Sequence, residues 1–117
     1  MAPWEVVFYE SSNGRTPVRD YLDGLSASDA ARVAVALRLL AEAGTELGMP
    51  HVRPIAGAEL WELRIRGRVQ HRVLYLAVSG RRLLLLHAFE KKTEKAPERA
   101  IATALQRLAD HRRRFGQ

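Results

Sequence analysis

The chain has 117 residues, 47% of them hydrophobic and 27% charged, which is typical of one soluble globular domain spanning residues 1–117. It contains no cysteine, and this excludes disulfides, thiolate catalysis and cysteine-ligated metal sites. Lysine and arginine number 19 against 13 acidic residues, so the formal net charge is +6. This charge favours a polyanionic partner, most commonly nucleic acid, although a general bias towards arginine produces the same excess.

Several classes of protein are disfavoured by missing patterns. No apolar run reaches the roughly 18 residues that a membrane helix needs, and the first ten residues lack the pattern of a secretory signal. We therefore expect no membrane contact, and the absence of cysteine fits a cytoplasmic protein. Glycine-rich phosphate loops, a G-x-S-x-G elbow and H-x-x-x-H spacing are also missing, so we expect no cofactor and no metal ligands.

The first 44 residues predict one strand and two helices. Aromatic and β-branched residues indicate a strand at Trp4–Glu10. After a turn, Thr16–Leu25 is predicted as a short helix with a proline in its first turn. Ser26–Gly44 is predicted as a second helix, because Ser26 and Asp29 have the spacing of a capping box and apolar residues recur at helical spacing.

Residues 45–58 are rich in glycine and proline and are predicted as loop, and three strands follow. They are Glu59–Arg66, Arg68–Gly80 and Arg82–Glu90. Trp61 lies on the apolar face of the first of these strands and is expected in the core. The third is apolar on both faces, as in a central buried strand.

A terminal helix at Pro97–Phe115 completes the predicted elements. Its expected inner stripe contains Ile101, Leu105, Leu108 and Phe115. The predicted order is β-α-α-β-β-β-α. Strands joined by hairpins favour a mainly antiparallel sheet of about four strands with helices on one face, an α+β fold.

Cationic side chains interrupt the predicted strands. Arg64 lies on the polar face of its strand, whereas Arg72 lies directly before the apolar run Val73 to Leu76. A charge among such neighbours is costly to bury without a partner. One explanation is a salt bridge with Glu62, which shares the face of Arg64. The other is a cleft in which both arginines hold a phosphate through forked hydrogen bonds.

The end of the last strand raises similar alternatives. Lys91 and Lys92 follow it directly, either as solvated loop residues or as part of such a cleft. His87 is more often a core histidine in this position. Phe89 is either a core residue or a stacking surface for a base.

The sequence between Leu60 and Ile101 contains the motifs LWELR, RVLY and LLHAFEKKTEKAP, and VFYES and GRTPVRDYL lie upstream. In these motifs the chain resembles the phage Gp49-like, HigB-like branch of the RelE/ParE toxins of type II toxin–antitoxin systems. The resemblance implies a compact RelE-like fold and a metal-independent mRNA endoribonuclease, ribosome-dependent or free, that halts translation. It also implies neutralisation by a cognate helix-turn-helix antitoxin, with operator DNA contacted only through that antitoxin.

By position, Arg64, Arg72, Lys91 and Lys92 correspond to the basic active-site residues of these toxins. Metal-free cleavage starts with attack of the 2′-hydroxyl on the adjacent phosphorus, so it needs a base, an acid and a cation that stabilises the phosphate. We expect the arginines to stabilise the phosphate. One of the two lysines is expected to bind the RNA backbone or to act as general acid.

The general base is open between Glu62 and a lysine whose pKa is lowered by clustered cations, with His87 in reserve. Further residues expected to bind RNA are Arg53, Arg66, Arg68 and Phe89. Two other functions remain open at this point. ParE-like relatives share the fold and poison DNA gyrase by binding it, and a degenerate module would bind only its partner or the operator.

Overall fold

The computed structural model describes residues 3–116, so the first two residues and the last residue of the predicted 1–117 domain lie outside the described residues. Five strands form one sheet in the order β1-β5-β4-β3-β2. Strand β1 is parallel to β5, and the other neighbours are antiparallel. The elements in chain order are β1 (Glu5–Phe8), α1 (Pro17–Asp23), α2 (Ala27–Ala43), the 3-10 helix η1 (Gly44–Glu46), β2 (Val52–Pro54), β3 (Trp61–Ile65), β4 (His71–Val78), β5 (Arg82–Glu90) and α3 (Glu98–Phe115).

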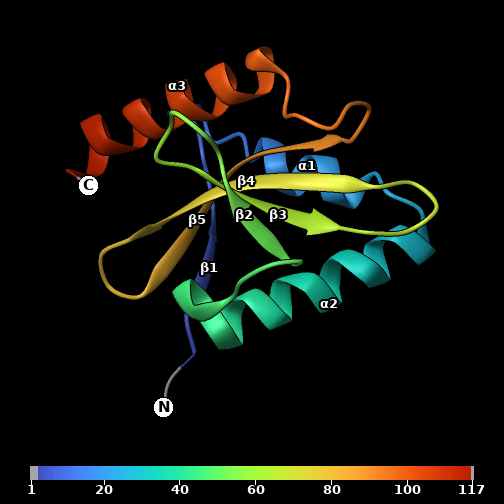
Figure 1. Cartoon of the computed structure of the whole chain (residues 1–117). Helices are drawn as coiled ribbons and strands as arrows, with labels where there is room; N and C mark the ends of the chain where they lie inside the picture. The colour runs from blue at the N-terminus through green and yellow to red at the C-terminus, as the bar shows by residue number, and fades with distance from the viewer. Residues whose placement is uncertain (1–2, 117) are drawn as a thin grey trace.

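Helices cover both faces of this sheet, with α3 on one side and α1 and α2 on the other (Figure 1). Strand β5 explains why. Leu83 and Leu85 pack into the core under α1 and α2, whereas Leu84 and Leu86 pack into the core under α3. The prediction of helices on one face is therefore wrong, because a strand that is apolar on both sides needs cover on both sides.

The predicted α+β class with a mainly antiparallel sheet is confirmed, but the sheet has five strands instead of about four. The missed strand is β2, which pairs with β3 through Val52 opposite Leu63. It has three residues, ends at Pro54 and lies at the sheet edge, where proline is tolerated. Its short length and the surrounding loop signals conceal it in the sequence.

The helices agree with the prediction in position and differ in their buried faces. Helix α2 is capped as expected, since the backbone N–H of Asp29 donates to Oγ of Ser26 at 3.1 Å. Helix α3 leaves Leu105 and Phe115 exposed at 38% and 61%. Its buried residues are Ala100, Ala104, Leu108 and His111. The expected inner stripe is therefore wrong except at Leu108 and the half-buried Ile101, because small alanines let the helix lie close to the sheet.

The expected core position of Trp61 is also wrong. Its side chain is 41% exposed, although its strand neighbours Leu63 and Ile65 are buried. Trp61 begins β3 and pairs with Pro54 at the end of the edge strand, so little of the fold extends beyond it. Within residues 3–116, no helix combines the length and apolarity that crossing a bilayer requires.

Candidate active site

Four strands bring most of the predicted site residues together on the face of the sheet that α3 covers. Arg64 on β3 lies directly opposite Arg72 on β4, and Arg72 lies opposite Phe89 on β5. Glu62, two residues before Arg64, lies opposite Arg53 of β2. Paired residues and alternate residues of a strand share a face. The register therefore brings together polar residues from three strands, with Phe89 of a fourth strand beside them.

Arg53, Arg64 and Arg72, here termed the arginine cluster, lie beside a single buried carboxylate. Oε1 of Glu62 is 3.2 Å from Nε of Arg53 and 3.6 Å from Nε of Arg72. Glu62 and Arg72 are each only 1% exposed. The predicted salt bridge between them is confirmed. It avoids the cost of several kcal/mol that an isolated buried ion carries.

The arginine cluster retains hydrogen-bonding capacity that residues 3–116 do not satisfy. Nε of Arg64 and Nη2 of Arg72 are buried and have no hydrogen-bond partner among those residues. Burial lowers the pKa of Arg72, Glu62 opposes that effect, and the charges of Arg64, Arg53 and Arg66 lower it further. Buried polar groups are normally paired. Two unpaired guanidinium nitrogens in an excess of positive charge therefore form a site suited to an anion that accepts hydrogen bonds.

The side chains of the two lysines that follow β5 lie in different surroundings. The N–H of Lys91 donates to the carbonyl of Gln70, which extends the pairing with β4 and keeps Lys91 on the face of Arg72. Nζ of Lys91 lies 3.2 Å from Oε2 of Glu94. Lys91, together with Arg53 and Arg64, lowers the pKa of the Glu94 carboxyl group. Lys91 and Glu94 thus belong to the surroundings of the arginine cluster.

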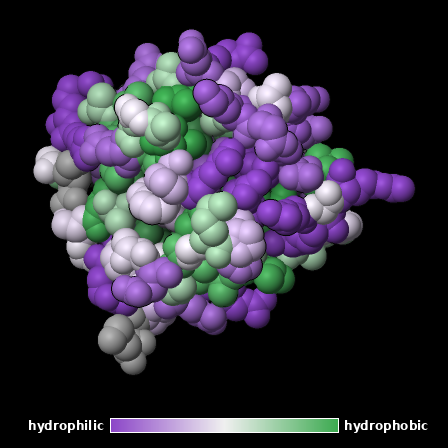
Figure 2. All heavy atoms as spheres, viewed as in Figure 1, coloured by the Kyte–Doolittle hydropathy of each residue, from purple (hydrophilic) through white to green (hydrophobic). Residues whose placement is uncertain are grey.

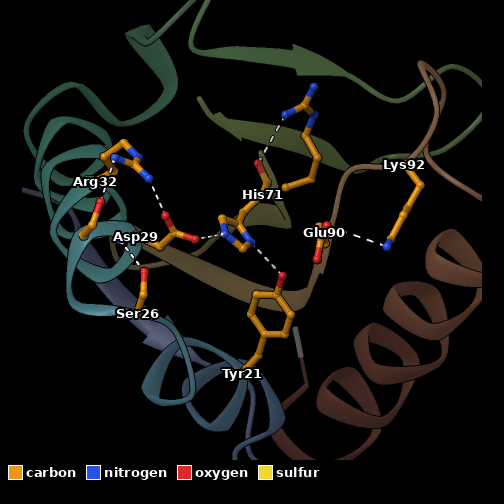
Figure 3. A network of polar contacts seen from close by, with 9 residues as sticks. Tyr21, Ser26, Asp29, Arg32, His71, Glu90 and Lys92 are labelled. Atoms are coloured by element: carbon orange, nitrogen blue, oxygen red, sulfur yellow. Dashed lines mark hydrogen bonds and ion pairs between the residues drawn. The ribbon is translucent and has the colours of Figure 1, made fainter. Parts of the chain in front are cut away.

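Lys92 is separate from that group. Its side chain is 74% exposed, and its Nζ lies 3.6 Å from Oε2 of Glu90. Glu90 pairs with His71 and lies on the opposite face of the sheet (Figure 3). Side chains alternate between the two faces along a strand, so the two adjacent lysines point to opposite sides. In the sequence alone they look equivalent.

A β-bulge in β5 sets the direction of His87. His87 pairs with Leu74, whereas Leu85 pairs with the next residue, Tyr75, so Leu86 is the extra residue. The bulge directs two consecutive side chains, those of Leu86 and His87, towards α3. A simple two-residue alternation would have separated them.

His87 is held as a neutral imidazole next to the site. Its ring stacks on Phe89 with 5.6 Å between the ring centroids. Nη1 of Arg107 on α3 donates to the Leu86 carbonyl at 2.8 Å and lies 3.3 Å from Nδ1 of His87. Burial and the charge of Arg107 lower the pKa of His87 to about 4. At neutral pH the His87 ring is therefore uncharged, so it accepts a hydrogen bond and cannot act as a general acid.

Stability is expected to fall on acidification because of His87. Its pKa in the folded protein, about 4, is below the ordinary value of 6.5, so between those values the unfolded chain binds more protons than the folded one. The free energy of unfolding is therefore independent of His87 protonation above about pH 6.5, and it falls by about 2–3 kcal/mol as the pH is lowered towards 4. Urea unfolding at about pH 7 and about pH 4.5 measures it.

The matched variant for this measurement is His87→Gln, which cannot titrate. The pKa of His111 is also lowered, by burial and by Arg82 and Arg114, so part of the acid sensitivity should persist in the variant. The difference between parent and variant isolates His87. An identical loss of stability in both proteins would contradict the assignment.

The opposite face of the sheet contains a hydrogen-bonded network that the sequence did not indicate (Figure 3). Nδ1 of the buried His71 lies 2.7 Å from the hydroxyl of Tyr21, and its Nε2 lies 3.0 Å from Oδ2 of Asp29. Burial, together with Glu90 and Asp29, raises the pKa of Tyr21 to about 12. The network joins α1 and the start of α2 to β4. A high tyrosine pKa fits an anchor and not a nucleophile.

The remaining predicted residues, Arg66 and Arg68, lie in the exposed connection between β3 and β4. Neither forms an ion pair with another residue in the described range 3–116. Arg66 acts on the site through its charge, since it contributes to the lowered pKa of Arg72. In that range, no three histidine, aspartate or glutamate side chains converge in a way that would hold a metal ion.

A comparison with known protein families matches residues 20–109 to the family described as "Phage derived protein Gp49-like (DUF891)". The matched span extends from α1 to α3 and includes every residue of the arginine cluster. A search of curated proteins gives no match.

Proposed function

The chain belongs to the Gp49-like family of phage-derived proteins, the family of HigB-like and RelE-like toxins, and on that premise we propose that it is a metal-independent endoribonuclease. Membership indicates a toxin of a toxin–antitoxin system. The observation that carries the nuclease is the arginine cluster. Its two buried guanidinium nitrogens without partners, in an excess of positive charge, suit the oxygens of a phosphate, which accept hydrogen bonds from such groups.

The reaction proceeds by attack of the RNA 2′-oxygen on the adjacent phosphorus. The bond from phosphorus to the 5′-oxygen breaks, and the products are a 2′,3′-cyclic phosphate and a 5′-hydroxyl. Arg64 and Arg72 stabilise the charge that develops on the phosphoryl oxygens, because prearranged cations in a site of low polarity act strongly there. Glu62 is a positioning residue, since it is 1% exposed and holds two of the arginines.

We assign proton transfer to two side chains on the exposed side of the site. The ammonium of Lys91 donates a proton to the leaving 5′-oxygen. The carboxylate of Glu94, 3.2 Å from Lys91 and 83% exposed, accepts the proton of the 2′-hydroxyl. Glu62 is too deeply buried for that role, and Nδ1 of His87 is engaged by Nη1 of Arg107 at 3.3 Å.

The partners follow from the same premise. mRNA, bound on the ribosome, is the proposed substrate, and translation is the process inhibited. A cognate helix-turn-helix antitoxin neutralises the toxin in the cytoplasm and connects it to operator DNA. The net charge of +6 supports partners with acidic surfaces, both RNA and antitoxin.

Lys91→Met is expected to slow RNA cleavage about 10²- to 10⁴-fold, because it removes the proposed acid while keeping the length of the side chain. The assay follows cleavage of purified mRNA, with and without ribosomes and in the presence of a chelator. Mass spectrometry of the product ends detects the cyclic phosphate.

Lys92→Met is the matched control, since it removes the same charge one residue away. Its cleavage rate should stay within about threefold of the parent, as for a surface charge. Equal losses in both variants would show that only net charge matters. DNA damage signalling without RNA cleavage after induction would replace the nuclease with the gyrase-binding alternative.

A further inference from the structure

A cavity opens beside the arginine cluster, between β2, the loop after β5 and the first turn of α3. Its volume is about 460 Å³, within the range of small-molecule sites. The apolar part of its wall consists of Pro54, Ile55, Ala56, Ala96 and Ile101. Arg53, Lys95 and Glu98 supply its charged part. Figure 2 shows that hydrophobic patches lie beside hydrophilic residues on the side of the molecule that faces the viewer in Figure 1.

Arg53 joins this cavity to the arginine cluster. Its Nε lies 3.2 Å from Glu62, and its Nη2 donates to the carbonyl of Glu94 at 2.8 Å. Its side chain also lines the cavity and is 33% exposed. The guanidinium group is thereby fixed in place by an acceptor on each side. A fixed guanidinium plane is a surface on which a nucleobase stacks.

We propose that this cavity binds the nucleobase adjacent to the phosphate held by the arginine cluster. The inference rests on the proposed function, since it places the RNA around the same phosphate. A nucleotide joins a flat, apolar base to a phosphate through one ribose. A site for that base must therefore adjoin the phosphate site and offer apolar contact together with polar groups for the base edge. The cavity meets each of these requirements.

Glu98 gives the cavity a preference among bases. Its side chain is exposed and forms no hydrogen bond or ion pair with residues 3–116, so it is free to contact a ligand. An ionised carboxylate only accepts hydrogen bonds. Adenine, cytosine and guanine each carry an exocyclic amino group that donates to a carboxylate. Uracil has only its N3–H as donor, and this group lies between two carbonyl oxygens that repel a carboxylate. The cavity therefore selects against uracil.

The test measures binding without cleavage. Four trinucleotides that differ only in one base are prepared with 2′-O-methyl groups, which block attack on the phosphate. The parent is expected to bind the three amino-bearing bases roughly tenfold more tightly than uracil. Glu98→Gln should remove most of that difference. Ala56→Trp, which fills the cavity, should weaken binding of all four roughly tenfold or more.

Two controls and one further probe make the result specific. Ala102→Trp adds the same side chain on an exposed position of α3 outside the cavity, and Glu42→Gln removes a carboxylate from α2. Both should bind as the parent does. Pyrophosphate, which has no base, should bind the parent, Ala56→Trp and Glu98→Gln with dissociation constants that agree within about twofold, since the arginine cluster is intact.

Equal affinity for all four trinucleotides in the parent, or unchanged affinities in both cavity variants, would overturn the base site while leaving the nuclease in place. Base discrimination by a protein that does not cleave RNA would support the base site and overturn the proposed reaction. The two failures are thus distinguished by binding and cleavage measured on the same preparations.

Discussion

Arg72→Ala is expected to abolish RNA cleavage and to lower the free energy of unfolding by about 3–5 kcal/mol. The side chain is 1% exposed, and its Nε lies 3.6 Å from the equally buried Glu62. Removing it leaves that carboxylate with Arg53 as its remaining ion-pair partner in residues 3–116 and leaves a buried volume unfilled. Denaturant unfolding and RNA cleavage of the same preparation measure both effects.

The double variant Glu62→Gln, Arg72→Met separates folding from chemistry. It removes the buried carboxylate that has lost one of its two arginine partners and refills the volume, so about 2 kcal/mol or more of the lost stability should return. Cleavage should stay absent, because the forked donor group is still missing. A stable double variant that cleaves RNA at the parental rate would show that Arg72 acts only through the fold.

Gly44→Ala is expected to destabilise the protein by about 3 kcal/mol or more. Gly44 follows α2 with φ of 56° and ψ of −129°, a conformation that is essentially restricted to glycine. A Cβ atom there would lie 2.1 Å from Nε1 and 2.3 Å from Cδ1 of Trp4. The end of α2 and the indole ring would have to separate, and thermal or urea unfolding should report the loss.

Gly48→Ala is the control for this prediction. It lies four residues later in the same connection, has no positive φ, and a Cβ there would meet nothing within 4 Å. The change should be neutral or slightly stabilising, since alanine restricts the unfolded chain. If Gly44→Ala were as stable as Gly48→Ala, the close contact with Trp4 would not hold in solution.

The grouping of the candidate residues in space was predictable where a local period was enough. Two-residue alternation placed Glu62 and Arg64 on one face of β3, and the adjacent hairpin strand supplied Arg72, so their association needed only the register of neighbouring strands. The capping residue Ser26 was also predictable, because a cap is a contact across three residues.

The prediction was incomplete where contacts between segments distant in the sequence determine the position of a side chain. Adjacent Lys91 and Lys92 look alike in the sequence, and the pairing of Lys91 with Gln70 distinguishes them. The bulge at Leu86 arises from a register shift against β4, which a run of four leucines does not reveal. The proposed role of Glu94 depends on a loop that folds back towards Arg53, 41 residues earlier.

The sequence by itself determined the α+β class, the strands that carry the arginines and the family, because these depend on period, local propensity and short motifs. The tertiary structure decided that helices cover both faces, that Trp61 is exposed, and that one lysine and one loop carboxylate complete the polar group. The physical reason is that burial and pairing are properties of surfaces brought together from separate segments. A charge such as Arg72 is stabilised by what the fold places beside it.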